Sequence, residues 1–115
     1  MVTLKVDPTM LEIVLSSTER RLGRLPGTIG IERAAIARVQ LTDEPWTWIR
    51  GGRSHGTHVR GAIAIGTWGT ATGDDLVIVR GRKLPGVVID LTGDPSYARI
   101  VLSTKNGEAL ARALN

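Results

Sequence analysis

Residues 76–103 read LVIVRGRKLPGVVIDLTGDPSYARIVLS, and this stretch gives the clearest indication of the fold. Three runs rich in β-branched residues are separated by GRKLPG and TGDPS, whose glycine, proline and aspartate residues are typical of turns. In the middle run, Val87, Ile89 and Leu91 occupy alternate positions and therefore share one face of a strand. The stretch predicts three short strands joined by turns.

The same alternation of apolar and polar residues continues toward the N-terminus. Val2, Leu4 and Val6 predict a first strand, and the run from Leu11 to Leu15 predicts a second one, joined to the first by the turn sequence DPT. Further strands are predicted within TIGIE, RVQLT and GAIAIGTW. ERAAIAR lies between two of these patterns and is short, so we expect a single helical turn there.

Two segments predict α-helices. In SSTERRLG, Ser16 or Ser17 can cap a helix of about two turns, with Glu19 placed in its positive first turn. In TKNGEALARALN, Leu110 and Leu114 lie four residues apart on one helix face. The apolar face of this last helix must cover another part of the molecule.

Seven or eight short strands followed by a helix predict a mainly β fold in which residues 1–115 make one domain. The economical arrangement is a partly open antiparallel barrel of about seven strands, closed at one opening by the C-terminal helix.

This order of elements resembles the pleckstrin-homology-like (PH-like) pattern. TWIRGGRSHGTHVRGAIAIGTW, DLVIVRGRKLPGVVIDLTG and YARIVLSTKNGEALARAL are similar to segments of small actinobacterial PH-like proteins of unknown role. The resemblance implies a PH-like barrel in a bacterial protein. PH domains that bind phosphoinositides usually carry basic residues in the first hairpin loop, and the loop VDPTM has none. The resemblance therefore does not imply specific binding of inositol phosphates.

The composition excludes several classes of site. Because the 115 residues include no cysteine, the chain has no disulfide framework, thiolate nucleophile or cysteine-ligated zinc. Because phenylalanine is also absent, we expect the core to consist of aliphatic residues and some of the three tryptophans. We find neither the apolar run of a signal peptide nor the roughly 18 apolar residues of a membrane span. We expect a soluble, cytoplasmic protein.

The formal net charge of +4 favours anionic partners. A predicted basic cluster could face a membrane or a nucleic acid, and it consists of Arg20, Arg21, Arg24, Arg80, Arg82 and Lys83. Nucleic-acid modules usually interleave exposed aromatic residues with such charges. This chain has only three tryptophans and one tyrosine, some of them needed in the core, so nucleic acid is the less favoured partner.

The segment RGGRSHGTHVRG, residues 50–61, admits three interpretations. His55 and His58, with Asp74 or Asp75, could bind a metal, but the glycines oppose the helix that would align two histidines three residues apart. The arginines and exposed backbone N–H groups could instead bind an anion.

The preferred interpretation is a glycine-rich connection that crosses between barrel edges, with a contact surface for a partner or an anion as its second role. PWTWIRGG is predicted to place two tryptophans on the same side of a strand. The candidate contact residues are Trp46, Trp48, Arg50, Arg53, His55, His58 and Arg60.

No set of catalytic residues is recognisable in the sequence. Ser54 and Ser96 lack the sequence context of an activated nucleophile, and Asp74 with Asp75 is expected in a hairpin turn. Asp90 is expected to be solvated or paired with an arginine. The sequence thus predicts a non-enzymatic interaction module without a cofactor, one that binds a protein partner or itself. The alternatives are a weak peripheral binder of anionic membrane lipids and a metal-dependent enzyme.

Overall fold

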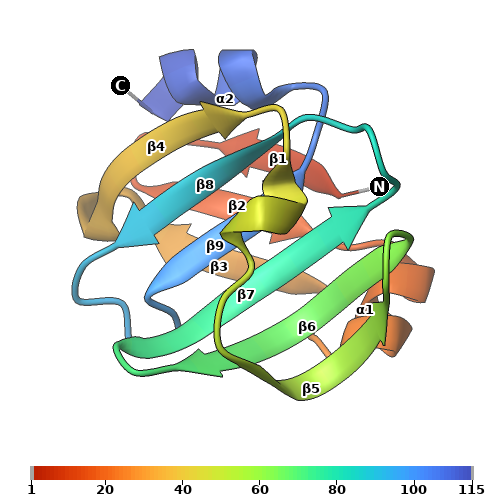
Figure 1. Ribbon diagram of the computed structural model, residues 1–115. Helices are drawn as coiled ribbons and strands as arrows, with labels where there is room; N and C mark the ends of the chain where they lie inside the picture. Colours follow the sequence, from red (N-terminus) through yellow and green to blue (C-terminus); the bar gives the residue numbers. More distant parts are fainter. Residues whose placement is uncertain (1, 115) are drawn as a thin grey trace.

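The computed structural model describes residues 2–114 and contains nine strands, two α-helices and two 3₁₀ helices within them (Figure 1). The strands are β1 (Thr3–Val6), β2 (Met10–Val14), β3 (Thr28–Glu32), β4 (Ile36–Thr42), β5 (Gly52–Val59), β6 (Ile63–Thr70), β7 (Gly73–Arg80), β8 (Gly86–Leu91) and β9 (Arg99–Ser103). The helices are α1 (Ser17–Gly23), η1 (Arg33–Ala35), η2 (Pro45–Trp48) and α2 (Gly107–Leu114). Within the described residues, no helix is long and apolar enough to cross a membrane.

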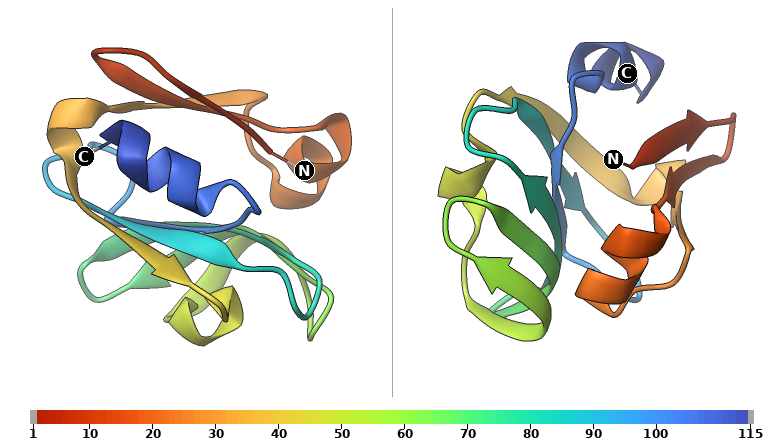
Figure 2. Two further views of the ribbon diagram at one scale, coloured as in Figure 1. Left: turned by 90° about the horizontal axis from the view of Figure 1, so that it is seen from above. Right: turned by 90° about the vertical axis from the view of Figure 1, so that its right-hand side faces the viewer.

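The strands form two separate sheets. One has the order β1-β2-β3, and the other has the order β4-β8-β9-β7-β6-β5. Figure 2 shows the smaller sheet lying over one face of the larger one, with α2 beside the opening between them. All neighbouring strands are antiparallel except β7 and β9, which are parallel.

The prediction of a partly open antiparallel barrel is therefore wrong, although the mainly β class and the C-terminal helix are confirmed. The reason is the position of the β8–β9 hairpin. It inserts between β4 and β7, so that β9 meets β7 in the parallel sense and β4 is separated from β5 by four strands. Alternation of apolar residues identifies strands and not their neighbours, and for this reason it could not reveal this order.

The main core lies between the two sheets. Side chains that are fully or almost fully buried there include Leu11, Ile13, Ile65, Ile78 and Ile89. α2 adds Leu110 to the same cluster and packs against β1 and β4, so the expectation that its apolar face covers the core is confirmed. The face of the large sheet that points toward the small sheet is called the inner face below, and the opposite one is called the outer face.

The start of α1 confirms the capping predicted from the sequence. The Ser16 hydroxyl accepts a hydrogen bond from the Glu19 N–H at 3.2 Å, and the Glu19 carboxylate accepts one from the Ser16 N–H at 2.9 Å. This reciprocal arrangement satisfies two backbone N–H groups at the beginning of the helix. The predicted single turn between β3 and β4 is also confirmed as η1.

Because β4 and β5 occupy opposite edges of the large sheet, residues 43–51 must cross its whole outer face, and Figure 1 shows η2 in front of that sheet. These residues are called the crossover segment. Two predictions are corrected here. The crossing is made by residues 43–51 and not by residues 50–61, of which residues 52–59 form β5. Trp46 and Trp48 belong to η2 and not to a strand, because Pro45 starts a helical turn there.

Candidate partner-binding surface

The crossover segment is fixed to the outer face by two tryptophans and a proline. The indole N–H of Trp46 donates to the Gly81 carbonyl at 2.7 Å, and that of Trp48 donates to the Thr42 hydroxyl at 3.1 Å. Pro45 is buried against Gly86, where a Cβ atom would lie 2.8 Å from the proline ring. The glycine thus permits the close approach of the segment to β8.

Beneath the crossover segment lies a second apolar cluster. Buried outer-face side chains of β6, β7 and β9 form it, and they are Ala64, Trp68, Val77, Val79 and Val101. Trp46, Trp48 and Ile49 of the crossover segment pack onto this cluster as half-buried residues. The large sheet is therefore covered on both faces, although only one face contacts the other sheet.

His58 of β5 joins the edge strand to this cluster. Its ring stacks on Trp46 with the centroids 6.3 Å apart and meets Trp68 edge-on at 5.9 Å. Trp46 and His58, both predicted contact residues, therefore lie side by side on the outer face.

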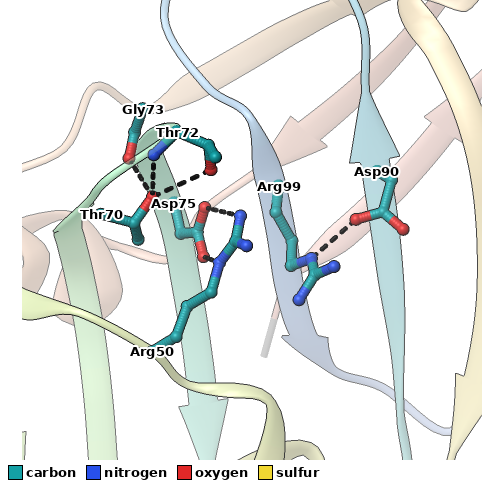
Figure 3. A network of polar contacts seen from close by, with 7 residues as sticks. All are labelled: Arg50, Thr70, Thr72, Gly73, Asp75, Asp90 and Arg99. Atoms are coloured by element: carbon teal, nitrogen blue, oxygen red, sulfur yellow. Dashed lines mark hydrogen bonds and ion pairs between the residues drawn. The ribbon is translucent and has the colours of Figure 1, made fainter.

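A row of five charged residues and one tryptophan, called the charged row, crosses the outer face from one edge of the sheet to the other. Registered partners on successive strands form this row, and in spatial order they are Arg38, Asp90, Arg99, Asp75, Trp68 and Arg53. The Arg99 Nε donates to the Asp90 carboxylate at 2.6 Å (Figure 3), which confirms the predicted pairing of Asp90 with an arginine. The Arg99 guanidinium also lies 5.4 Å from the centre of the Trp48 ring.

The crossover segment supplies a further cation to this row. Arg50 donates through Nε and Nη2 to the two carboxylate oxygens of Asp75, at 2.7 and 3.1 Å (Figure 3). The Asp75 side chain is 1% exposed and that of Arg50 is 38% exposed. The hydrogen bond to Asp75 raises the pKa of the Arg50 guanidinium. This two-pronged geometry is the strong form of the arginine–carboxylate pair.

Asp75 was predicted to be an ordinary turn residue, and this prediction is wrong. The turn ends at Gly73, and Asp75 lies within β7 in register with Arg99. Its position two residues before Val77 and four before Val79, both on the buried outer face, is the sequence signal that could have revealed it.

The remaining predicted contact residues lie on the exposed edge strand. Arg53 and His55 are exposed on β5, and Arg60 is exposed in the turn that follows. Neither arginine belongs to an ion pair within residues 2–114. His55 pairs with an inner-face residue of β6 and His58 with an outer-face residue, so the two imidazoles lie on opposite faces. Among the described residues, no three His, Asp or Glu side chains are placed to hold a metal ion.

The predicted basic cluster is brought together at one end of the molecule. α1 packs against β5 and β6, and the Thr57 hydroxyl donates to the Leu22 carbonyl at 2.8 Å. The guanidinium of Arg82, in the β7–β8 turn, lies against Gly61 in the β5–β6 turn. Exposed cations of α1 and the two turns therefore share this basic end, and they are Arg20, Arg21, Arg24, Arg60, Arg82 and Lys83. Arg80 is nearby and pairs with the buried Glu19 at 3.7 Å.

A cavity of about 250 Å³ lies beside β3 and the β8–β9 loop. Met10, Ile29 and Ile31 provide apolar lining, while Glu32 and Asp94 provide carboxylates. Burial and the nearby Asp94 carboxylate raise the pKa of the Tyr97 hydroxyl, which also lines the cavity. Ser96 is the lining serine, and neither histidine of the chain is among the lining residues, so this cavity does not bring a nucleophile to an imidazole base.

Comparisons with protein-family models, with curated proteins and with solved structures give no match to this chain. Any statement about function therefore depends on the surface itself. That surface consists of the exposed edge of β5, the adjoining tryptophan and histidine cluster, and the end of the charged row.

Proposed function

We propose that this protein is a binding module that receives an extended segment of another protein along the free edge of β5. The observation that carries the proposal is the strand order. β5 is eight residues long, ends the six-stranded sheet and, within the described chain, pairs only with β6. A strand with unpaired N–H and C=O groups is a ready template for strand addition.

The phase of the hydrogen-bond ladder indicates which groups of β5 are available. The Gly81 N–H donates to the Ala62 carbonyl at 2.8 Å, and successive residues of an antiparallel strand bond to opposite neighbours. Ile65, three residues after Ala62, therefore bonds toward β5, where its partner is Thr57. The N–H and C=O groups of the next residue, His58, consequently point toward the free edge.

The other sheet edges are less suited to strand addition. α2 packs against β4 and β1, and Gly107 of this helix approaches Leu41 of β4. β3 is five residues long and continues directly through η1 into β4. β5 is both longer and more exposed than β3, so it is the edge that best supports an added strand.

A selection of random ten-residue peptides displayed on phage tests this function. We expect selected peptides to shift the backbone amide resonances of Gly52–Val59 and to slow their hydrogen exchange, because an added strand bonds to this edge. N-methylation of the peptide amides that face β5 should abolish binding, whereas methylation of the alternate amides should preserve it. Resonance shifts confined to another surface, or equal effects of both methylation patterns, would reject strand addition.

A second candidate function is weak binding to anionic membrane lipids, and the basic end favours it. Arg50 is engaged by Asp75, so we assign the lipid contacts to the exposed cations of α1 and the two turns and not to Arg50. Each basic residue near an anionic surface contributes about 1 kcal/mol, so several together would give weak and salt-sensitive binding.

Flotation with phosphatidylcholine vesicles, with and without phosphatidylserine, tests the lipid candidate at low and physiological salt. We expect binding only to the anionic vesicles, and the double variant Arg82→Glu/Lys83→Glu should weaken it about tenfold or more. Lys5→Glu/Arg38→Glu changes the net charge equally and should have a smaller effect, since Arg38 pairs with Asp90 at the end of β8 that is remote from the β7–β8 turn. Equal flotation with neutral vesicles, or equal losses in both variants, would exclude a membrane role for the basic end.

A further inference from the structure

We infer that the segment received by β5 is acidic at alternate positions and comes from a different protein rather than from a second copy of this chain. This inference rests on the proposed strand addition and specifies the chemistry of the partner. Three features of the edge support it: the charges carried by β5, the result of pairing β5 with itself, and the charged row that ends there.

The edge carries positive charge that the described chain does not neutralise. Arg53 and Arg60 are exposed and belong to no ion pair within residues 2–114, in contrast to Arg50, Arg80 and Arg99. β5 itself contains no acidic residue. Acidic side chains on an added strand could therefore form ion pairs with these two guanidinium groups without displacing a partner within residues 2–114.

Pairing of two copies through β5 would place like charges together. An antiparallel pair centred on Thr57 and continued by one residue past β5 sets Arg53 opposite Arg60 at both ends, because the register shift of β5 leaves out Ser54. Like charges directly opposite each other destabilise strand pairing, so the edge disfavours its own copy and favours a strand of opposite charge.

The charged row across the outer face extends toward the added strand. From β4 to β7 its signs alternate in the order Arg38, Asp90, Arg99 and Asp75. Trp68 follows on β6, and the row ends with the cation Arg53 on β5. The next position beyond Arg53 belongs to the added strand, and an acidic residue there would continue the alternation of signs.

The other face of β5 indicates the intervening residues of the partner. Val59 is 53% exposed and, with Leu41, is one of the two exposed large apolar side chains within the described residues. It pairs with Ile63, which packs on the main core, and so belongs to the inner face. Residues of the added strand that point to this face would be apolar. The partner segment would therefore alternate acidic residues with β-branched apolar ones.

Three synthetic ten-residue peptides test the inference. All three carry valine and threonine at the same alternate positions, and the positions between them are all Glu, all Gln or all Lys. Binding is measured by isothermal titration and mapped by the amide resonances of β5. We expect the Glu peptide to bind about fivefold more tightly than the Gln peptide at low salt, and the Lys peptide to bind most weakly, because exposed ion pairs each contribute modestly.

Charge reversal in the protein completes the test. Arg53→Glu/Arg60→Glu should invert the order so that the Lys peptide binds most tightly, while Lys5→Glu/Lys105→Glu should retain the preference for the Glu peptide. If all three peptides bind equally along β5, the acidic partner is rejected and strand addition stands; the arginines then only protect the edge from aggregation. If no peptide perturbs β5, both proposals fail. If the wild-type protein forms a dimer whose interface maps to β5, the inference that a second copy does not bind there is rejected.

Discussion

Replacement of Arg50 by alanine is expected to lower the free energy of unfolding by about 3 kcal/mol, because it leaves the carboxylate of Asp75 buried without its strongest partner. Asp75 is 1% exposed and receives two hydrogen bonds from Arg50. Arg99 faces Asp75 from β9, but its Nε is already bonded to Asp90, so it can compensate only in part. The crossover segment should also loosen, since Arg50 is its attachment nearest to β5.

Urea denaturation measures this loss, and tryptophan fluorescence reports the crossover segment through Trp46 and Trp48. Arg53→Ala is the matched control, since it removes an exposed arginine from a neighbouring position and should change stability by no more than about 0.5 kcal/mol. The double variant Arg50→Ala/Asp75→Asn should be more stable than Arg50→Ala because it removes the uncompensated charge. If Arg50→Ala cost no more than Arg53→Ala, the ion pair would not contribute to folding.

Gly66→Ala is expected to cost about 3 kcal/mol or more and to detach β5 from the sheet. Gly66 has a φ of 150°, and a Cβ atom there would lie 2.1 Å from the His55 carbonyl oxygen and 2.8 Å from the Gly56 Cα. Because these atoms belong to the backbone of the adjacent strand, no side-chain rotation can relieve the overlap. Strands β5 and β6 must separate instead.

Hydrogen exchange followed by NMR measures this effect at single amides. In Gly66→Ala, protection should fall most at the β5–β6 ladder and remain in β8 and β9. Gly52→Ala is the control on the same pair of strands, because a Cβ atom there has no neighbour within 4 Å, and its effect should be within about 0.5 kcal/mol. Peptide binding to β5 should be lost together with the protection. A stable Gly66→Ala variant with full protection of β5 would contradict the close approach of the two strands.

The local structure of this protein could be predicted from its sequence because it depends on nearby residues. Alternating apolar residues located the first hairpin, and Ser16 with Glu19 located the start of α1. β5 was missed because its apolar content is low: the seven residues before the exposed Val59 are all Gly, Arg, Ser, Thr or His, and the strand shows no apolar alternation. An edge strand exposed on both faces has no buried side to produce such a pattern.

The candidate site was predictable only in part, since it is assembled from residues far apart in the chain. Trp46 and His58 were both expected at a contact surface, and the structure places their rings together. The pairing of Arg50 with Asp75 depends on the crossing of residues 43–51 over the whole sheet, and this crossing follows from strand order. Strand order is determined by contacts across the complete sheet, and no short segment of the sequence contains it.

The central position of β8 and β9 has a consequence for synthesis of the chain on the ribosome. β4 ends at residue 42, and its partner β8 begins at residue 86, which is 44 residues later. At a synthesis rate of roughly 5–20 residues per second, about 2–9 s pass between the end of β4 and the start of β8. The β5–β6–β7 meander can form early from local contacts, but β7 then also lacks its neighbour β9. The large sheet can therefore be completed only after translation has passed residue 103, and until then two strands are open to mispairing or to a chaperone.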